Sequence, residues 1–194
     1  MKKIKQILVG THNKGKFREL SYLLPNNLKK LSPFNLNIKS PKETGKSFKS
    51  NSELKAKYFF KKTRIPSISD DSGLCVEKLG NKPGIQSSRW AKKNGGFKLA
   101  MKKIIKLLKK KNRKAKFVCS LTLQLSEKKK ITVQGEIKGN ISLKVLGNKG
   151  FGYDSIFIPK GHKKTFGEMT QKKKIFLDHR YIAFKKLKKK TTAL

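Results

Sequence analysis

The feature that most constrains the fold is an apolar segment followed at once by a glycine-containing loop and a helix. Residues 4–9 (IKQILV) fit a buried strand, and the loop over 10–15 leads into a helix expected over about 16–24. The leucines of that helix fall on one face, and Pro25 ends it because proline cannot continue a helix. A strand that runs directly into a helix is typical of α/β proteins. The start of the chain therefore predicts an α/β fold.

The rest of the chain alternates strands and helices early and pairs strands late. The predicted elements are a short strand near 36–39, helices over about 47–62, 97–110 and 170–188, a strand over 67–70 ending in an acidic turn at 70–73, a hairpin of 116–125 and 130–137, and a strand over 155–158. The chain has no internal repeat and no clear linker. We therefore expect a mixed sheet in a single domain over residues 1–194, with a lysine-rich tail at about 185–194.

The charge is extreme but evenly distributed. The 194 residues carry a formal net charge of +39, and 45 of the 50 basic residues are lysine. Such an excess attracts polyanions, yet a dedicated nucleic-acid binder usually clusters its charge and relies on arginine for bidentate contacts. Here lysine occupies even the exposed faces of amphipathic helices. The composition favours a general lysine bias, and no specific nucleic-acid partner is expected.

Cysteine usage and hydropathy bear on the compartment. Cys75 and Cys119 have no CxxC spacing, and the first residues form too short an apolar run for a signal peptide. No stretch approaches the roughly 20 apolar residues that cross a bilayer. A cytoplasmic protein with two free thiols and no membrane partner is the expectation.

The loop after the first strand suits phosphate. Residues 10–16 read GTHNKGK, which fits the first part of a P-loop, but Phe17 stands where a P-loop needs the hydroxyl residue that binds Mg²⁺. Unpaired N–H groups at a helix start attract anions, Gly15 allows close backbone approach, and Lys14 and Lys16 add charge. Either a phosphate-binding loop or a plain strand–helix turn explains this segment by itself.

Carboxylates are scarce, so the places where they gather are informative. The chain has 11 acidic residues, and Asp70 and Asp71 are adjacent in the segment DDSG. Two neighbouring carboxylates cannot both be buried without a cation or a hydrogen-bond network, and Mg²⁺ prefers carboxylate and phosphate oxygens. Glu43 is a second candidate ligand, and Asp154 is a third acidic group, beside a glycine-rich loop. A simple turn is the alternative, because Asp, Ser and Gly are common turn formers.

Five segments in order resemble the inosine/xanthosine triphosphate pyrophosphatase family over nearly the whole chain. They are THNKGKFREL (11–20), ETGKSFKSNSELKA (43–56), SDDSGLCVEKLGNKPGIQSSRW (69–90), GFGYDSIF (150–157) and KIFLDHR (174–180). The resemblance implies an elongated mixed sheet with flanking helices, forming two lobes around a nucleotide cleft, usually in a homodimer. It implies Mg²⁺-dependent hydrolysis of deaminated purine triphosphates (dITP, ITP, XTP and dXTP) to the monophosphate and pyrophosphate, which cleanses the nucleotide pool and prevents their incorporation into DNA and RNA.

The resemblance also assigns roles to residues. Asp71 is implied as general base and metal ligand, with Glu43 as second ligand, and Phe151 as the residue that stacks on the base. The implied substrate-binding residues are Thr11, His12, Asn13, Lys14, Gly15, Lys16, Ser72, Phe151, Gly152, Tyr153, Asp154, Lys174, His179 and Arg180. Among them, Lys174 is implied to meet phosphate and His179 and Arg180 to read the base. A 6-keto purine accepts hydrogen bonds there, whereas adenine presents a 6-amino donor.

The chain departs from the family pattern at a few positions. Lys42 precedes Glu43 where many relatives carry a second acid, residues 171–173 replace acidic residues, and Asp178 stands where a small hydroxyl residue is common. These changes bear on metal affinity and substrate preference. Two other functions stay open at this point: a non-enzymatic RNA-binding protein driven by the lysine excess, and a related pyrophosphatase for modified pyrimidine triphosphates.

Overall fold

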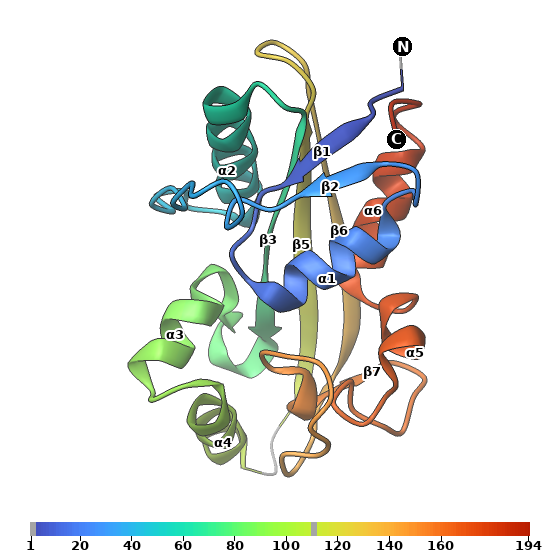
Figure 1. The fold of residues 1–194 in the computed structure, drawn as a ribbon. Coiled ribbons are helices and arrows are strands. Elements are labelled where there is room, and N and C mark those ends of the chain that lie inside the picture. The colour runs from blue at the N-terminus through green and yellow to red at the C-terminus, as the bar shows by residue number, and fades with distance from the viewer. Residues whose placement is uncertain (1–2, 110–111) are drawn as a thin grey trace. The chain divides into compact units, whose positions relative to one another are not determined.

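The protein is described by a computed structural model that covers residues 3–109 and 112–194 (Figure 1). It divides into two compact units. Unit 1 comprises Met1–Asp71, Cys119–Gly135 and Arg180–Leu194, and unit 2 comprises Ser72–Val118 and Glu136–His179. Within the described residues, seven strands join one mixed sheet in the order β2-β1-β3-β5-β6-β7, with β4 paired to β3. The predicted α/β class with a mixed sheet is therefore confirmed.

Unit 1 begins with the expected strand and helix. Its elements are β1 (Gln6–Val9), α1 (Lys14–Leu23), β2 (Lys29–Leu31), α2 (Phe48–Thr63) and α6 (His179–Lys188), together with parts of β3 (Ser67–Val76), β5 (Lys114–Gln124) and β6 (Lys130–Ile141). Strand β1 pairs in parallel with both β2 and β3. Strand β1 pairs with β3 at Leu8–Ser67 and Val9–Ile68, so the carboxyl end of β1, where the loop before α1 starts, lies next to the first half of β3, which carries the Asp70–Asp71 pair.

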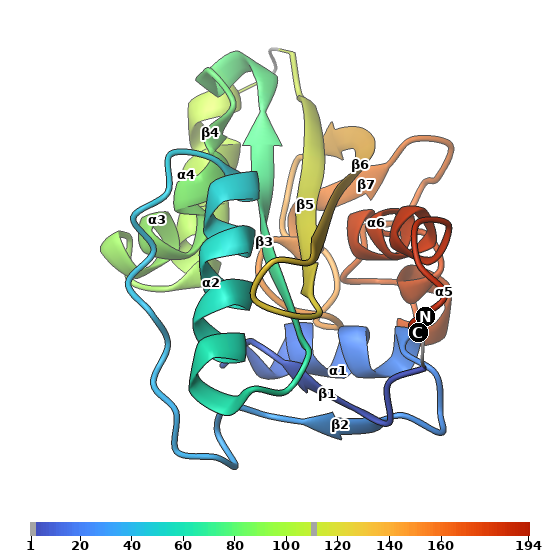
Figure 2. The same ribbon diagram turned by 90° about the horizontal axis from the view of Figure 1, so that it is seen from above.

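The two faces of the sheet in unit 1 have different characters because side chains alternate along each strand. On β5, Cys119, Leu121 and Leu123 belong to an apolar core that includes residues of α1 and α6. The alternate residues Ser120 and Thr122 instead meet Ser52 of α2, with Oγ–Oγ and Oγ–Oγ1 distances of 3.0 and 2.9 Å. Figure 2 shows α2 and α6 on opposite sides of these strands. Helix α2 thus packs over a buried polar face.

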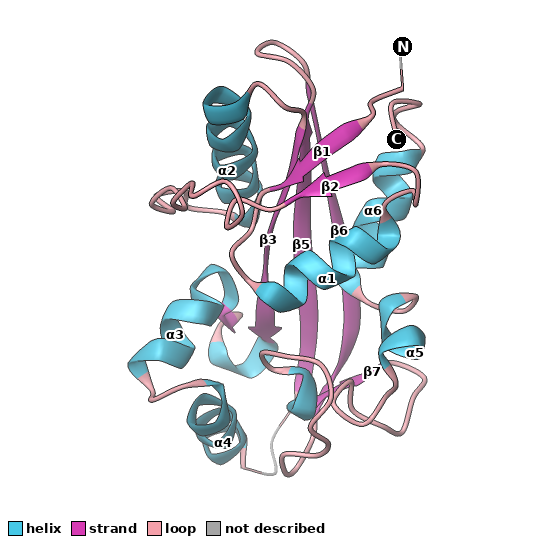
Figure 3. Cartoon of the chain, in the orientation of Figure 1, coloured by secondary structure: helices cyan, strands magenta, loops and turns pink. Residues whose placement is uncertain are grey.

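Unit 2 has its own apolar core. Its further elements are β4 (Lys82–Pro83), α3 (Ser87–Lys93), α4 (Phe97–Leu108), β7 (Phe157–Pro159) and α5 (Gln171–Ile175), with short 3₁₀ turns at Glu77–Leu79, Gly84–Gln86 and Asp154–Ile156 (Figure 3). Ala100, Ile104 and Leu108 recur on one face of α4 and pack against Leu74 and Phe117 of the sheet. The amphipathic helix expected over 97–110 is present through Leu108; residue 110 lies outside the described residues.

Three local predictions were wrong. The strand expected near 36–39 is a turn, and the strand of this region is β2. The acidic turn expected at 70–73 is part of the continuous strand β3. The helix expected over 170–188 is two helices, α5 and α6, separated after Phe176, the C-cap of α5. Asp178 directly precedes α6, and aspartate is favoured just before a helix start.

Several other expectations are confirmed. The hairpin is present as β5 and β6, and both cysteines are free and buried. The lysine-rich tail is helical up to Lys188, and near its end the carbonyl of Ala193 accepts a hydrogen bond from the backbone N–H of Ile4. Within the part of the chain that the structure describes, no helix is long and apolar enough to span a membrane.

Candidate active site

The loop between β1 and α1 is fixed by its own side chains. Asn13 caps α1 by accepting a hydrogen bond from the backbone N–H of Lys16 at 3.0 Å, and its own N–H donates to Oγ1 of Thr11 at 3.2 Å. Nδ1 of His12 lies 2.6 Å from Oγ of Ser40. The first backbone N–H groups of a helix have no partner within the helix, so they can bind an anion. Because α1 begins at Lys14, Gly15 and Lys16 are helical.

A cavity opens beside this loop. It has a volume of about 720 Å³ and is lined by Thr11, His12, Asn13, Lys14, Phe17, Arg18, Ser21, Lys30, Ser32, Phe34 and Asn35. Three basic side chains and the amides of two asparagines give it an anion-binding character. Asp71 and Glu43 are not among the described residues that line it. The cavity therefore belongs to the loop and not to the acidic residues.

The first residue of the acidic pair, Asp70, is fully buried, and cationic side chains surround its carboxylate. Its Oδ2 lies 3.2 Å from Nζ of Lys16 and accepts hydrogen bonds from Nε and Nη2 of Arg180 at 3.3 and 3.1 Å. Burial by itself would raise the pKa of Asp70, but the charges of Lys16, Arg180 and Lys55 outweigh it and hold the pKa well below its usual range. Asp70 is thus a permanently ionised anchor.

The second residue, Asp71, has a different environment. Its Oδ2 accepts a hydrogen bond from Nδ2 of Asn51 at 3.0 Å, and its Oδ1 lies 3.7 Å from Nζ of Lys55. The same ammonium group donates to Oε1 of Glu43 at 2.7 Å. Asn51 and Lys55 are one helical turn apart on α2, so both reach Asp71 in the middle of β3. Glu43, Asn51, Lys55 and Asp71 form what we call the acid–lysine cluster.

Two pKa shifts in this cluster bear on its chemistry. Burial raises the pKa of the Asp71 carboxyl, a change that Lys55, Lys16 and Asn51 oppose only in part. Burial would lower the pKa of Lys55, but Asp71, Asp70 and Glu43 outweigh it and raise the pKa. A carboxylate with a raised pKa is a stronger base, and a lysine with a raised pKa stays cationic at neutral pH. The cluster therefore pairs a proton acceptor with a fixed positive charge.

The donor set of the cluster fits a hard divalent cation in part. Glu43 and Asp71 supply carboxylate oxygens, and Mg²⁺ is commonly held by one or two carboxylates plus substrate phosphates and water. Within residues 3–109 and 112–194, no group of three or more His, Cys, Asp or Glu side chains is assembled for a metal. A cation at Glu43 and Asp71 would need its remaining ligands from a phosphate chain and water.

Arg180 is held by two acids of unit 1. Its guanidinium donates to Asp70 and, through Nη1, to Oε2 of Glu19 on α1. All three side chains are almost completely buried. Arginine suits this role because its planar fork can serve two carboxylates and never loses its charge. The structure thus gives Arg180 a place in a buried ion network, and the base-reading role implied by the resemblance stays a prediction.

In unit 2, the glycine-aromatic segment is organised around a second buried lysine. Nζ of Lys174 lies 2.6 Å from Oδ2 of Asp154 and 4.7 Å from the ring centroid of Phe151. The backbone N–H of Phe151 donates to the same Oδ2 at 2.8 Å. Gly150 has a φ of +75°, and a Cβ there would lie 2.2 Å from Asp154 Oδ2, so only glycine fits. Lys174 therefore fixes the conformation of this segment. The half-buried ring of Phe151 lies beside the ammonium group of Lys174.

The remaining predicted site residues have defined surroundings. His179 is buried and its ring stacks on Phe117, with centroids 4.8 Å apart and planes at 11°. Tyr153 donates from its hydroxyl to the backbone carbonyl of Ser87 at 3.0 Å, and burial raises the pKa of its hydroxyl. Ser72 is half-buried on β3 and Gly152 has a φ of +66°. These contacts hold the segments that carry the predicted site residues in place.

The structure brings the predicted residues together in two sets. Unit 1 holds Thr11, His12, Asn13, Lys14, Gly15, Lys16, Glu43, Asp71 and Arg180, and unit 2 holds Ser72, Phe151, Gly152, Tyr153, Asp154, Lys174 and His179. Sequence reasoning missed Asn51 and Lys55 in the cluster, and Glu19 beside Arg180. One signal was available for the first two: Asn51 and Lys55 are polar residues on the same stripe of α2 as the buried Ala56 and Phe59, where a polar side chain needs a partner.

Comparison with known proteins gives a consistent answer over nearly the whole chain. The model of the Ham1 family matches residues 7–190. A dITP/XTP pyrophosphatase of Zymomonas mobilis is 38% identical over 187 residues, covering 94% of this chain and 90% of the relative. One from Caulobacter vibrioides is 38% identical over 186 residues, covering 94% and 96%.

Solved structures agree in fold. A HAM1 protein from Coxiella burnetii superposes with a TM-score of 0.87 at 30% identity and covers 98% of this chain and 100% of that one. The Ham1 protein of Staphylococcus aureus gives a TM-score of 0.83 at 29% identity, with 95% and 97% covered. These relatives confirm the expected resemblance and the expected class of enzyme, a nucleoside-triphosphate pyrophosphatase. The chain belongs to the Ham1 family.

Proposed function

We propose that this protein hydrolyses deaminated purine nucleoside triphosphates, among them dITP, ITP, XTP and dXTP, to the nucleoside monophosphate and pyrophosphate. The acid–lysine cluster of unit 1 is the observation that supports it most strongly. Asp71 has a raised pKa and a fixed orientation through Asn51, as a general base requires. The names of the relatives, dITP/XTP pyrophosphatases, include two of these substrates. Such an activity would remove damaged triphosphates before they enter DNA or RNA.

The reaction needs water to attack the phosphorus nearest the nucleoside, because the leaving group is pyrophosphate. In the proposed mechanism, Asp71 accepts the proton of the attacking water. Lys16 and the N–H groups at the start of α1 bind the phosphate chain and stabilise the charge that develops on its oxygens. Lys55, whose pKa is raised, stays cationic between Glu43 and Asp71 and favours the ionised form of Asp71.

A divalent cation, which we expect to be Mg²⁺, would be held by Asp71 and Glu43 and by oxygens of the substrate. When bound, it supplies further neutralisation of the triphosphate and polarises its phosphoryl oxygens. Lys42, which precedes Glu43 and is exposed, adds a positive charge next to this ligand. The affinity for the cation is therefore expected to be modest until the phosphate chain adds its own charge.

Base selection is proposed for unit 2 and the start of α6. The half-buried ring of Phe151 would stack on the purine, and His179 and Arg180 would donate to its 6-keto oxygen. Lys174, already paired with Asp154, would add positive charge toward phosphate. We further propose a homodimer that works in the cytoplasm.

The test is a pyrophosphate-release screen over the common and the deaminated triphosphates, each with and without Mg²⁺. We expect release from ITP, XTP and their deoxy forms to exceed release from ATP and GTP by at least about 100-fold, as for a site built on a required hydrogen bond. Release that is equal for all purines, or fastest for modified pyrimidine triphosphates, would contradict the proposed substrate class. Binding of RNA at about 150 mM salt that displaces nucleotide would favour an RNA-binding protein.

A further inference from the structure

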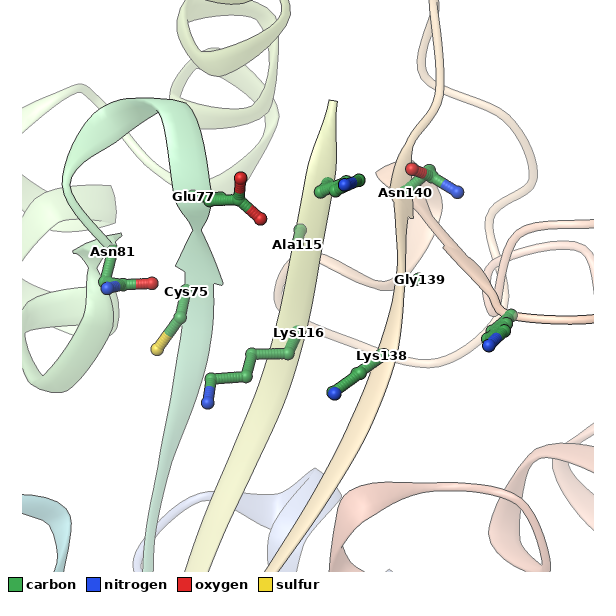
Figure 4. A pocket seen from close by; sticks show the side chains of 10 residues that line it. Cys75, Glu77, Asn81, Ala115, Lys116, Lys138, Gly139 and Asn140 are labelled. Carbon is green, nitrogen blue, oxygen red and sulfur yellow. The ribbon is translucent and has the colours of Figure 1, made fainter. Parts of the chain in front are cut away.

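A second cavity, outside the site described above, lies in unit 2. It has a volume of about 550 Å³ and is formed over neighbouring strands β3, β5 and β6 and the residue after β7 (Figure 4). Its lining residues are Cys75, Glu77, Asn81, Lys114, Ala115, Lys116, Lys138, Gly139, Asn140 and Lys160. Four of these ten are lysines, and none is aromatic. The composition of the lining suits an anion that has no ring to stack.

The lysines share one face of the sheet because side chains alternate along a strand. On β5, Ala115 and Phe117 point into the apolar core of unit 2, so Lys114 and Lys116 point to the opposite face. On β6, Ile137 and Ile141 contact the same core, which puts Lys138 on the opposite face as well. Figure 4 shows Lys116 on β5 and Lys138 on the neighbouring strand β6, with Cys75 on β3.

Two lysines are placed directly opposite each other. Strands β6 and β7 are antiparallel with Gly139 opposite Pro159, and the N–H of Lys160 donates to the carbonyl of Lys138 at 2.9 Å. Like charges in directly opposite positions destabilise a sheet. Gly139 permits this close pairing, because a Cβ there would lie 2.2 Å from the carbonyl oxygen of Ile158. The fold thus places two lysines at facing positions of neighbouring backbone segments at the edge of the cavity.

The acids near the cavity do not balance its charge. Glu136 pairs with Lys116 at 2.9 Å, and that hydrogen bond raises the pKa of Lys116. Glu77 accepts a hydrogen bond from Nδ2 of Asn112 at 3.0 Å. Lys114, Lys138 and Lys160 form no ion pair with any residue that the structure describes. With only Glu77 to oppose them, these three lysines leave an excess of positive charge in one cavity.

We infer that this cavity binds an anion made of linked phosphates, such as pyrophosphate or a short polyphosphate, independently of the nucleotide site. Lysine is a compact point charge that binds phosphate oxygens, and the amides of Asn81 and Asn140 can donate further hydrogen bonds. Two linked phosphates carry enough negative charge to neutralise the three lysines. A second copy of this chain would instead bring a like set of lysines against them, which electrostatics disfavours.

The first experiment is a calorimetric titration with sodium pyrophosphate at about 150 mM salt, without divalent metal. The test variant is Lys138→Gln/Lys160→Gln, and the matched control is Lys98→Gln/Lys102→Gln on the exposed face of α4, which removes the same charge. We expect the test variant to bind at the unit 2 site at least about tenfold more weakly than wild type, since two charge-assisted contacts are lost. Equal weakening in the control would show a general charge effect and would overturn the inference.

Pyrophosphate is also the product of the proposed reaction, so the two sites must be separated. Lys16→Gln removes a charge from the nucleotide site and leaves unit 2 intact. We expect this variant to keep the pyrophosphate-dependent NMR shifts of the Gly139 and Asn140 amides, whereas Lys138→Gln/Lys160→Gln loses them. If Lys16→Gln abolished all binding and the unit 2 variant bound normally, the cavity would not be a phosphate site. That result would leave the proposed hydrolysis untouched.

Thermal unfolding and sedimentation complete the test. Without an anion, Lys138→Gln/Lys160→Gln should melt at or above the wild-type temperature, because a like-charge pair is relieved. Pyrophosphate should raise the melting temperature of wild type more than that of the variant. A variant that melts lower than wild type without an anion contradicts the like-charge argument. A change in sedimentation mass would show that a second copy covers this face, which would also overturn the inference.

Discussion

Among the residues that the structure describes, each unit buries one lysine against carboxylates, and the two arrangements differ in a way that separates a proposed catalytic group from a structural one. In unit 1, Nζ of Lys55 is shared between Glu43 at 2.7 Å and Asp71 at 3.7 Å, and the Glu43 side chain is 34% exposed. In unit 2, Lys174 pairs with Asp154 at 2.6 Å, and both side chains are at most 4% exposed. The first arrangement keeps a solvent-accessible acid beside a carboxyl with a raised pKa. The second is a closed pair that shapes a loop.

Burial of a lysine is therefore not by itself a sign of catalysis. A closed pair mainly fixes geometry, and losing one partner leaves an unpaired buried charge. An open, shared lysine tunes the protonation of its neighbours instead. We therefore expect changes in unit 1 to alter rate and pH dependence, and changes at Lys174 to alter stability together with efficiency.

The largest effect is expected at Asp71. Asp71→Asn keeps the size of the side chain and removes the base, so kcat should fall by roughly 10²–10⁴-fold while the Kd for substrate changes little. Single-turnover rates and equilibrium binding measure the two quantities. Glu127→Gln is a suitable control, because Glu127 is an exposed acid paired with Arg64. Turnover near the wild-type level in Asp71→Asn would place the catalytic base elsewhere.

The next effect is a loss of stability at the closed pair. Lys174→Ala leaves Asp154 buried without its cation, which should lower the free energy of unfolding by about 3–5 kcal/mol. At temperatures where the variant stays folded, kcat/KM should fall by similar factors for ITP and ATP. Urea denaturation of Lys174→Ala and of Lys174→Ala/Asp154→Ala measures the pair. A double variant as unstable as the single one would show that the unpaired charge is not the cause.

A smaller effect is expected for base discrimination. Arg180→Ala removes a donor proposed to meet the 6-keto oxygen, so the ratio of kcat/KM for ITP over ATP should fall several-fold, as for one hydrogen bond of about 0.5–1.5 kcal/mol or more. The same change leaves Glu19 and Asp70 without their shared partner, so Arg180→Lys is the matched variant that keeps the charge. If Arg180→Ala lowers the stability of the protein but leaves the ITP-to-ATP ratio of kcat/KM unchanged, Arg180 belongs to the buried ion network and does not contact the base.

The smallest effect is expected at Lys55, the lysine shared between Glu43 and Asp71. The charge of Lys55 lowers the pKa of Asp71, so Lys55→Met should raise that pKa and move the acid limb of the kcat profile to higher pH, by about one unit or more. A rate profile between about pH 5 and 9 measures the shift. Lys57→Met, at an exposed position of the same helix, is the control. An acid limb that stays in place would show that Asp71 is not the group that titrates.

The well-predicted parts of the fold are those with strong local periodicity. The strand and helix at the start, the long helix α2, the amphipathic α4 and the β5–β6 hairpin follow from patterns within 10 to 20 residues. The errors fall where distant contacts decide. Asp70–Gly73 has turn-forming residues, yet Arg180, 110 positions away, and Asn51, 20 positions away, hold the two acids on a strand. No local pattern carries that information.

The α/β class and the prediction that the scarce acidic pair matters follow from the sequence, because each depends on residue type and short spacing. The difference between the two acids follows from tertiary contacts. Lys16 and Arg180 neutralise Asp70, whereas burial raises the pKa of Asp71 beside Asn51 and Lys55. Adjacent residues on a strand point to opposite faces. Identical neighbours in the sequence thus meet different charges, and the pKa of each is set by groups that only folding brings near.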